Sequence, residues 1–569
     1  MEGLSLARPD WEERIRALQS LIPDGVKDVN PALSARAVGI FNKLRIPDIP
    51  GTPSFGEVGG EWLREIIGGF LGSISPITGE RLVRELFLMV PKKTGKTTSS
   101  AGLMLTALLM NTRPRAKFLL TGPTQEVSDL AFDQACGMIE KDPEGFLQKR
   151  MHVQTHLKTI TDRRTKAELR VKTFDMSVAV GSIPAGVLFD ELHVISKNSQ
   201  ASRVIGQLRG GMISNPEAFL AFITTQSDEP PAGAFKAELA LARAIRDGRV
   251  DGRTLPVLYE FPKAIMEDRG KPPAWENPEN WRMVTPNDGR SITIRRLVED
   301  FDAAKQKGPE EVRRWLSQHV NLELGLGLKT DRWVGADYWE DCANPSLTLD
   351  GILDRCDLIV IGVDGGGLDD LLGLSVLGRD KHNPRLWLHW CHAWAHKSVF
   401  ERRKDIAERL RDFAHDGDLT VVENVSDDVK DVADLVQRID DTGFLPNKNA
   451  IGADQVGIGD IVDELTVERG MPIERIAGVK QGWEMTNAIK DCERKLAGKE
   501  FEHCGQPLMA WNVGNAKVEP RGNAITITKQ NAGNAKIDTL MSLFDAAKVL
   551  RANSAIPSSV YEERGPLFL

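Results

Sequence analysis

The sequence predicts an α/β protein with two separate sheet-containing blocks. Apolar runs of strand length alternate with helical patterns through both halves of the chain, as expected for helices packed on mainly buried sheets. The chain has 569 residues, which is more than one hydrophobic core usually serves, so two large units are expected. Hydrophobic residues make up 41% and charged residues 27%, and this composition excludes a disordered or fibrous protein.

The first block is expected at 56–260, after an N-terminal extension at 1–55. Its apolar runs are short and bounded by turn residues, which indicates strands, and longer 3.6-period patterns between them indicate helices. The expected strands are 84–90, 116–122, 185–191 and 218–225, and the expected helices are 95–110 and 125–140.

A connecting subdomain is expected at 261–350, because this stretch is rich in Pro, Trp and Asn and has two helical segments but little strand signal. The second block, 351–569, opens with a strand and a hairpin-like pair, LLGLSVLG and RLWLHWC. The remaining elements expected there are strands at 357–364 and 449–454 and helices near 398–414, 427–439, 458–469 and 535–551.

Charge and hydropathy limit the class of protein. The net charge of −8 excludes the overall basic character of a tight, static DNA binder. Basic runs at 161–172 and 401–404 could still contact DNA locally, although a solvated face explains either run as well. No run of about 18 uncharged apolar residues is present, so we expect no membrane span and a cytoplasmic location.

The six cysteines are scattered without a CxxC pair, so free thiols in a reducing compartment are expected. The segment WLHWCHAWAH (387–396) could suggest zinc, but its strand-like start favours aromatic core. His193 is likewise expected to make a local structural contact.

A phosphate-binding loop is indicated by VPKKTGKTT (90–98), which lies between a strand and a helix. Backbone N–H groups at the helix start would hold phosphate oxygens, Lys96 would reach the β and γ phosphates, and Thr97 would bind Mg²⁺. Val90 replaces the first glycine of the usual pattern. The expected nucleotide-binding residues of this loop are Lys93, Thr94, Gly95, Lys96, Thr97 and Thr98.

A second acidic element supports an ATPase, because GVLFDE (186–191) is an apolar strand that ends in two carboxylates. Asp190 would hold Mg²⁺, and Glu191 would orient or deprotonate the attacking water. A third strand ends in a stretch where a γ-phosphate sensor would lie: Thr224, Thr225 and Gln226. The first block is therefore expected to be a P-loop ATPase domain of the ASCE, RecA-like type.

A cation that neutralises transition-state charge is also expected near the phosphates. Lys92 in the loop ranks first for this role, and Arg203 and Arg209 compete with it. Preference for ATP over GTP stays open, because no clear adenine-contacting glutamine precedes the loop and Trp62 occupies that neighbourhood.

The second block predicts an RNase H-like nuclease. Asp364 and Asp454 end two strands, and Asp538 lies in the first turn of the last helix. Three carboxylates brought together are tolerable only if metal neutralises them, so two Mg²⁺ or Mn²⁺ ions roughly 4 Å apart are expected to promote DNA hydrolysis. Nearby acids that could substitute for these three are Asp370, Glu423, Asp460 and Asp545.

In order and spacing, these motifs resemble the large terminase subunits of tailed bacteriophages along nearly the whole chain. The stretches that carry the resemblance include VPKKTGKTT, VLFDELH, FITTQ, WENPENW, TPNDG, WLSQHVNLELG, IGVDGGGLDDLLGLSVLG, IGADQVG and KIDTLMSLFDA. The resemblance implies ATP-driven translocation of double-stranded DNA into a prohead, and endonucleolytic cutting of concatemeric DNA. It also implies a small terminase subunit and the portal protein as partners, and a homo-oligomeric ring, commonly a pentamer, in the host cytoplasm and not in the mature virion.

Two other classes stay open from the sequence. A helicase-like repair or recombination ATPase with an RNase H-like nuclease would unwind strands, whereas a packaging motor moves intact duplex. A DNA-binding scaffold with a remnant phosphate loop would hydrolyse no ATP, although Lys96, Thr97, Asp190 and Glu191 all have suitable chemical identities.

Overall fold

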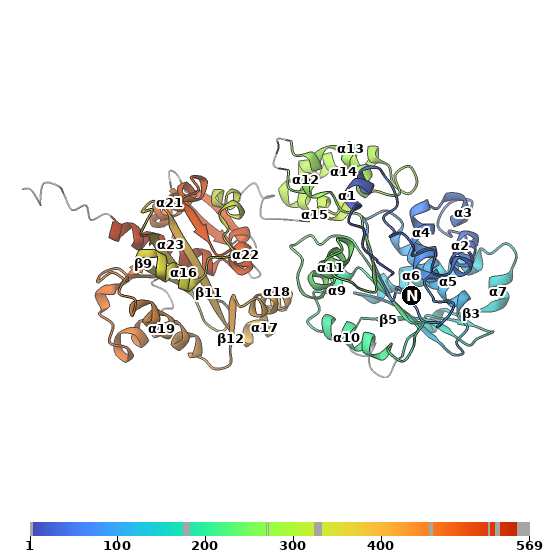
Figure 1. Ribbon diagram of the computed structural model, residues 1–569, viewed down its shortest axis with the longest axis horizontal. Helices are drawn as coiled ribbons and strands as arrows, with labels where there is room; N and C mark the ends of the chain where they lie inside the picture. The colour runs from blue at the N-terminus through green and yellow to red at the C-terminus, as the bar shows by residue number, and fades with distance from the viewer. Residues whose placement is uncertain are drawn as a thin grey trace, which may run out of the picture. The chain divides into compact units, whose positions relative to one another are not determined.

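The computed structural model divides into two compact units, Met1–Gly325 and Leu326–Leu569 (Figure 1). The boundary lies inside the predicted connecting segment 261–350. The residues that the structure describes are 4–174, 183–268, 270, 272–323, 333–454, 459–521, 524–529 and 535–554.

The first unit contains an eight-stranded sheet with the order β3-β4-β5-β2-β6-β7-β1-β8. The four predicted strands are confirmed as β1 (Glu85–Met89), β2 (Lys117–Gly122), β6 (Gly186–Asp190) and β7 (Phe219–Thr224), and all are parallel to their neighbours. The strands that the sequence did not predict are β3 (Met151–Gln154), β4 (Thr159–Asp162), β5 (Glu168–Thr173) and β8 (Thr254–Leu258).

Helix α5 (Lys96–Met110), which follows the phosphate loop, is buried along most of its length. It is apolar almost all round, and such a helix is stable only inside a core. The other helices of this unit are α1 (Trp11–Arg16), α2 (Pro31–Lys43), α3 (Phe55–Val58), α4 (Glu61–Gly72), α6 (Gln125–Glu140), α7 (Phe146–Arg150), α9 (Leu192–Ile195), α10 (Ala201–Gly211) and α11 (Gly233–Arg246).

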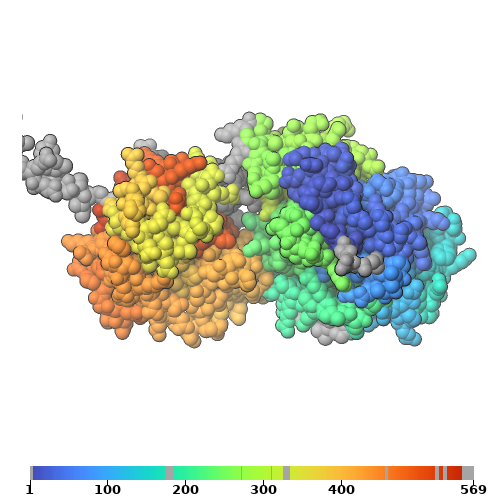
Figure 2. Space-filling view, in the orientation of Figure 1, coloured from blue at the N-terminus to red at the C-terminus, as the bar shows by residue number. Residues whose placement is uncertain are grey.

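A helical subdomain at 263–320 completes the first unit. It comprises α12 (Lys263–Met266), α13 (Pro278–Val284), α14 (Ile294–Lys307) and α15 (Pro309–Val320). Its centre is a cluster of aromatic rings, in which the ring centroid of Trp281 lies 5.0 Å from that of Trp315, in a tilted arrangement, and 5.4 Å from that of Phe301, edge to face. In Figure 2 the N-terminal residues, coloured dark blue, cover part of the surface beside this subdomain, coloured light green.

The second unit contains a sheet with the order β12-β11-β10-β9-β13-β14, and β15 pairs with the start of β11, at Trp387–His389, on the edge of β11 opposite β10. Strands β9, β10 and β11 are antiparallel to one another, β12 is parallel to β11, and β13 and β14 continue parallel to β9. The strands are β9 (Cys356–Gly365), β10 (Leu372–Asp380), β11 (Trp387–His396), β12 (Leu419–Val422), β13 (Ile451–Asp454), β14 (Ile476–Val479) and β15 (Phe501–His503).

The last long helix, α23 (Asp538–Ser554), packs across β9, β10 and β13. A separate hairpin, β16 (Ala516–Arg521) with β17 (Ala524–Lys529), lies in the same unit. The remaining helices are α16 (Leu349–Arg355), α17 (Ser398–Arg402), α18 (Lys404–His415), α19 (Asp427–Asp440), α20 (Gly459–Asp463), α21 (Thr486–Ala497) and α22 (Pro507–Asn515).

Among the described residues, no helix is both long and apolar enough to cross a membrane. All six cysteines are free.

Candidate active sites

The phosphate-binding loop is a tight backbone turn between β1 and α5. Lys93 and Gly95 have φ angles of 68° and 77°, in the left-handed region, and α5 begins directly after Gly95. Glycine adopts this conformation at little cost, but a lysine there is strained and must be held by its surroundings. The first N–H groups of α5 have no partner within the helix, so they can receive an anion.

Lys96 is buried behind this loop, with only 7% of its surface exposed. Its Nζ donates to the carbonyl of Val90 at 3.3 Å and lies 3.8 Å from Glu191 Oε1. Burial lowers the pKa of Lys96, and Glu191 and Asp190 act in the opposite direction. Val90, the departure from the usual loop pattern, extends β1 by donating to Thr224 O at 3.1 Å.

The helical subdomain fastens the loop through three backbone contacts. Asn287 Nδ2 donates to Thr94 O at 2.9 Å, and Ser291 Oγ donates to Lys93 O at 2.6 Å. The N–H of Lys92 donates to Gln318 O at 2.7 Å. These bonds hold the loop around the strained Lys93. The sequence identified TPNDG as part of the resemblance but assigned no role to its Asn287.

The predicted acid pair lies at the end of β6. Asp190 is 3% exposed. Glu191 has a φ of 56°, a strained backbone conformation for a residue other than glycine. Among the described residues, Asp190 Oδ1 is buried without a hydrogen-bond partner, and Glu191 Oε2, which also makes no hydrogen bond, lies 3.3 Å from His193 Nδ1. Burial, and then the charge of Glu191, raise the pKa of Asp190 to about 7. Buried carboxylate oxygens without hydrogen bonds suit a bound cation. A cation offsets both the cost of burying the charges and the repulsion between the two carboxylates.

Strand β7 lies between the loop-bearing β1 and the acid-bearing β6. Thr224 pairs with Met89, and Ile223 pairs with Asp190, so the residues after β7 fall between the loop and the acid pair. Thr224 Oγ1 donates to Thr225 O at 2.9 Å.

Gln226, the expected sensor, has its side-chain amide engaged on both sides. Its Nε2 donates to Glu323 at 3.4 Å, and its Oε1 accepts from the N–H of Ser227 at 2.9 Å. Thr225 Oγ1 is buried and has no hydrogen-bond partner in the described part of the chain. Of the three predicted sensor residues, Thr225 is therefore the one with an unused side-chain group.

The structure separates the candidate charge-stabilising cations. Arg209 forms bidentate ion pairs with Glu85 and Glu238. Glu85 is the first residue of β1, whereas the loop follows the last residue, so Arg209 lies at the far end of β1 from the loop. Burial alone would lower the pKa of Arg209, but these carboxylates raise it and give the residue a structural role. Arg203 is exposed. Lys92 is half-buried, and its positive charge lowers the pKa values of Lys96 and His193, so it stays the first candidate for this role.

In the second unit, Asp364 and Asp454 lie at adjacent strand ends. Gly362 pairs with Gly452 and Val363 with Ala453, so the next residue of each strand is an aspartate on the same face of the sheet. Helix α23 covers this face, because Ser375, which pairs with Gly362, donates its hydroxyl to Thr539 O at 3.0 Å.

Glycines in three strands let the backbone of α23 lie directly on the sheet. A Cβ added to Gly362 would lie 1.8 Å from Ser542 O, and one added to Gly452 would lie 2.6 Å from Asp545 O. A Cβ at Gly373 would lie 2.7 Å from the carbonyl carbon of Asp538. Only glycine permits this approach.

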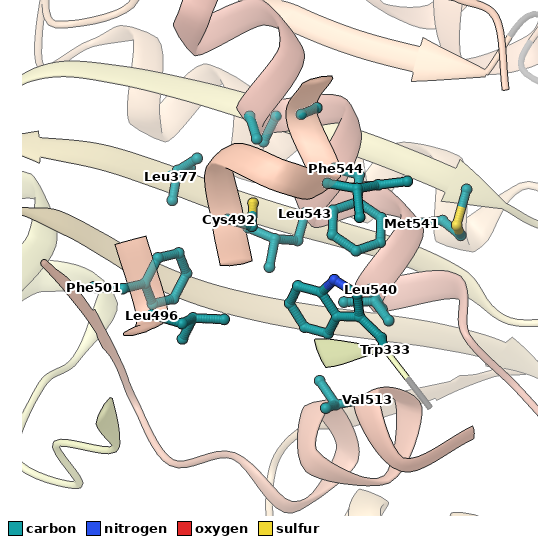
Figure 3. Packing of buried hydrophobic residues seen from close by; sticks show 14 of the residues in the cluster. Trp333, Leu377, Cys492, Leu496, Phe501, Val513, Leu540, Met541, Leu543 and Phe544 are labelled. Atoms are coloured by element: carbon teal, nitrogen blue, oxygen red, sulfur yellow. The ribbon is translucent and has the colours of Figure 1, made fainter. Parts of the chain in front are cut away.

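The other side of α23 is anchored in a hydrophobic cluster that includes Leu540, Leu543 and Phe544 (Figure 3). The ring of Trp333 lies 5.2 Å from Phe544. The helix is thus held from both sides with Asp538, its first residue, at the strand ends.

Asp364, Asp538 and Asp545 are buried, Asp454 is half-buried, and their charges act on one another. Burial, and then the charge of Asp538, raise the pKa of Asp364, and Asp454 adds to the shift. Burial, and then Asp370, raise the pKa of Asp538 to about 7. Asp538 Oδ2 and both side-chain oxygens of Asp545 are buried without a partner in the described ranges.

The donor chemistry of these carboxylates fits Mg²⁺ or Mn²⁺, which prefer oxygen ligands. Within the described ranges, no three acidic, His or Cys side chains are already close enough together to form a metal site. Like charges repel without a cation, so the fit rests on the unused, buried oxygens.

Of the four alternative acids, Asp545 is the one with both oxygens unused. Its burial and the charges of Asp364 and Asp454 raise its pKa well above the usual value. Asp370 is paired with Lys536 and Lys529. Glu423 is exposed and pairs with Lys397, and Asp460 is also exposed.

Two residues at this site were not predicted from the sequence. Gln481, in the loop after β14, donates its side-chain amide to Asp364 Oδ1. Lys529, at the end of β17, lies 3.6 Å from Asp538 Oδ1. Both come from loops or hairpins without a motif, so no sequence signal identified them.

The histidines of 387–396 bond to protein side chains. His389 Nε2 lies 3.1 Å from Ser375 Oγ, and His392 Nε2 lies 2.8 Å from Thr420 Oγ1. His396 Nδ1 lies 2.8 Å from Ser398 Oγ. His193 Nδ1 lies 3.0 Å from Thr224 Oγ1, a local structural contact of the predicted kind.

Two family models match the chain. The model for the ATPase domain of the terminase large subunit matches residues 61–240, and the model for the endonuclease domain of the same subunit matches residues 271–554. Both matched domains are enzymatic domains of a terminase. The matches therefore favour neither a helicase-like repair protein nor a scaffold without enzymatic activity.

The chain is also similar to individual proteins. The large terminase of bacteriophage HK97 is 17% identical, with 90% of this chain and 99% of that chain covered and a TM-score of 0.45. The large terminase of a thermophilic bacteriophage, solved in complex with ADP, is 13% identical, with 84% and 94% covered and a TM-score of 0.28. The large terminase nuclease of thermophilic phage G20c with bound magnesium is 18% identical, with 34% and 80% covered and a TM-score of 0.22.

Protein YmfN of Escherichia coli strain K12 is 21% identical over 284 residues, which are 48% of this chain and 59% of YmfN. Together the two family models cover most of the chain and describe consecutive domains of one protein. The chain therefore belongs to the terminase large subunit family, with the ATPase domain of that subunit followed by its endonuclease domain.

Proposed function

We propose that this chain hydrolyses ATP to translocate double-stranded viral DNA into a prohead and cuts concatemeric DNA with a metal-dependent endonuclease. The observation that carries the proposal is the presence of two sets of buried carboxylates with unused oxygens, one in each unit. In the first unit these oxygens belong to Asp190 and Glu191 at the end of β6. In the second unit they belong to Asp538 and Asp545 of α23, the helix that packs across β9 and β13, whose ends carry Asp364 and Asp454.

In the first unit, the loop N–H groups and Lys96 bind the phosphates of ATP. Thr97 and Asp190 would hold Mg²⁺, which when bound neutralises charge on the phosphates. Glu191 orients the attacking water and accepts its proton, and Lys92 stabilises the charge that develops on the phosphates. The remaining loop residues, Lys93, Thr94, Gly95 and Thr98, shape the phosphate pocket. The stretch from Thr224 to Gln226 responds to the γ-phosphate, through the unused hydroxyl of Thr225 and through Gln226, which must exchange its bond to Glu323 for one to the phosphate.

In the second unit, Asp364, Asp454 and Asp538 would hold one or two Mg²⁺ or Mn²⁺ ions. Such ions supply Lewis acid chemistry to phosphodiester hydrolysis when they are bound. The chain itself fixes the carboxylates, because the glycine contacts under α23 set the distance between helix and strand ends. Gln481 fixes the side-chain orientation of Asp364.

The family suggests the partners and the setting. We propose that the chain works with a small terminase subunit and a portal protein, as a pentameric ring in the host cytoplasm. The large terminase of a thermophilic bacteriophage has been solved with ADP, and the nuclease of phage G20c with magnesium. We propose the same classes of ligand, a nucleotide and Mg²⁺, for this chain.

Two reciprocal variants test the assignment in the full chain. Glu191→Gln should lower DNA-stimulated ATPase activity by about 10²-fold or more, because the water loses its general base, and leave Mn²⁺-dependent plasmid cleavage unchanged. Asp364→Asn should abolish cleavage and spare ATPase activity, so each variant is the folding control for the other. Loss of both activities in either variant, or of neither, contradicts the assignment.

Translocation has its own measurement. With proheads, small subunit and ATP, the wild-type chain should make linear duplex DNA resistant to DNase, whereas Glu191→Gln should not. Strand separation of that duplex by the chain alone would instead support the helicase-like alternative.

A further inference from the structure

Lys529 brings a positive charge to the carboxylates of the nuclease site. Its Nζ lies 3.2 Å from Asp370 Oδ2 and 3.6 Å from Asp538 Oδ1, and its charge also acts on Asp364. Lys529 is the last described residue of β17, in the two-stranded sheet that is separate from the main one. The hairpin therefore contributes a cation to a site whose acids come from β9 and α23.

The register of the hairpin directs this side chain inward. Lys529 pairs with Ala516, and Ile525, Ile527 and Val518 share its face of the hairpin. Those three apolar side chains pack against the core of the unit, so the face that carries Lys529 is the inner one. Lys517 pairs with Thr528 and lies on the opposite face.

Asp370 does not need Lys529 for neutralisation. Lys536 is 2% exposed and bonds both to the Asp370 side chain and to the carbonyl of Asp369, at 3.0 Å in the latter case. The side chain of Lys529 is 34% exposed. Lys536 is thus buried in a structural ion pair, whereas Lys529 keeps about a third of its side chain exposed.

We propose that Lys529 is a further catalytic residue of the endonuclease, whose ammonium group binds a non-bridging oxygen of the scissile phosphodiester. This inference rests on the proposed nuclease function. In hydrolysis, the water oxygen bonds to phosphorus, the bond from phosphorus to one deoxyribose oxygen breaks, and that oxygen takes a proton. Negative charge grows on the non-bridging oxygens during this exchange, and a fixed ammonium donor stabilises it. Lys529 keeps its own proton throughout.

Two other roles predict different behaviour. If Lys529 only replaces a metal ion until one binds, its removal should leave cleavage equal or faster. If Lys529 only supports the hairpin, its removal should lower stability and metal binding together with cleavage.

The test compares Lys529→Met, Lys529→Arg and Lys517→Met in the full chain, where the last variant removes the same charge from the opposite face of the same hairpin. Plasmid cleavage with saturating Mn²⁺, ATPase activity, thermal unfolding and calorimetric Mn²⁺ binding are measured for each.

Lys529→Met should cut about 10²-fold more slowly, as expected for the loss of one donor to transition-state charge. Lys529→Arg should recover much of this loss, because it keeps a cationic donor, and Lys517→Met should cut like the wild type. Mn²⁺ binding to Lys529→Met should be as tight as in the wild type or tighter, because a competing cation is gone.

If the wild type cuts and Lys529→Met cuts at the same rate or faster, the proposed role of Lys529 is wrong, but the proposed nuclease function still stands. Loss of Mn²⁺ binding or of the unfolding transition in Lys529→Met also overturns it. A wild-type chain that does not cut overturns the proposed nuclease and this role with it.

Discussion

Among the described glycines, Gly362 leaves the least room for an added Cβ, so Gly362→Ala directly perturbs the contact between β9 and α23. The added Cβ would lie 1.8 Å from the carbonyl oxygen of Ser542, and 2.6 Å from the N of Ala546. Both are backbone atoms inside a helix, so no side-chain rotation can relieve the overlap. The helix must move away from the sheet.

The size of that movement follows from the overlap. Ordinary contact begins near 3.4 Å, so α23 must rise by about 1.5 Å at Ser542. Overpacking of this kind typically costs about 1–3 kcal/mol of unfolding free energy. Because Asp538 lies one helical turn before Ser542, it moves as well, and a misplacement of about 1 Å can lower a rate by about 10²-fold.

Plasmid cleavage with Mn²⁺ and ATPase activity, measured on the same full-length preparation, are the assays. Gly362→Ala should lose cleavage by about 10²-fold and keep its ATPase activity, because the ATPase site belongs to the other unit. Gly351→Ala in α16 is the matched control, since its added Cβ meets nothing closer than 3.5 Å. Wild-type cleavage by Gly362→Ala would refute the reasoning that this contact positions the aspartate.

Two further predictions concern the ATPase unit. Without metal and nucleotide, Asp190→Asn should stabilise the first unit at pH 8 by about 1–3 kcal/mol but not at pH 4, as measured by urea unfolding. The reason is that the pKa of Asp190 is raised from 3.8 to about 7 in the folded protein. Ionising Asp190 in the folded state therefore costs free energy, and this cost appears as the pH rises from about 4 to above 7. Equal stabilisation at both pH values would contradict this cause. Asn287→Ala removes the hydrogen bond to Thr94 O and should weaken ATP binding about tenfold, as measured by titration with a fluorescent nucleotide. Plasmid cleavage should be unchanged. Unaltered nucleotide affinity would mean that the helical subdomain does not hold the loop.

The sequence by itself determined the local elements and the chemistry at their ends. Each predicted strand of the first unit lies within two residues of its observed position, because a buried strand between turn residues is a local signal. The acids Asp190, Asp364 and Asp454 were recognisable because each ends an apolar run. The strands β3, β4 and β5 were missed because they are short or partly polar, so pairing rather than composition defines them.

Only the tertiary structure decided which residues meet. The position of β7 between β1 and β6 depends on long-range pairing, and so does the contact of Asn287 with a loop almost two hundred residues earlier. In the sequence, the glycines under α23 indicate only that the backbone has conformational freedom there. Their role as the contact surface for α23 is visible only in the folded structure. Lys529 and Gln481 join the aspartates for the same reason: proximity in a fold comes from packing between segments, which local sequence patterns do not encode.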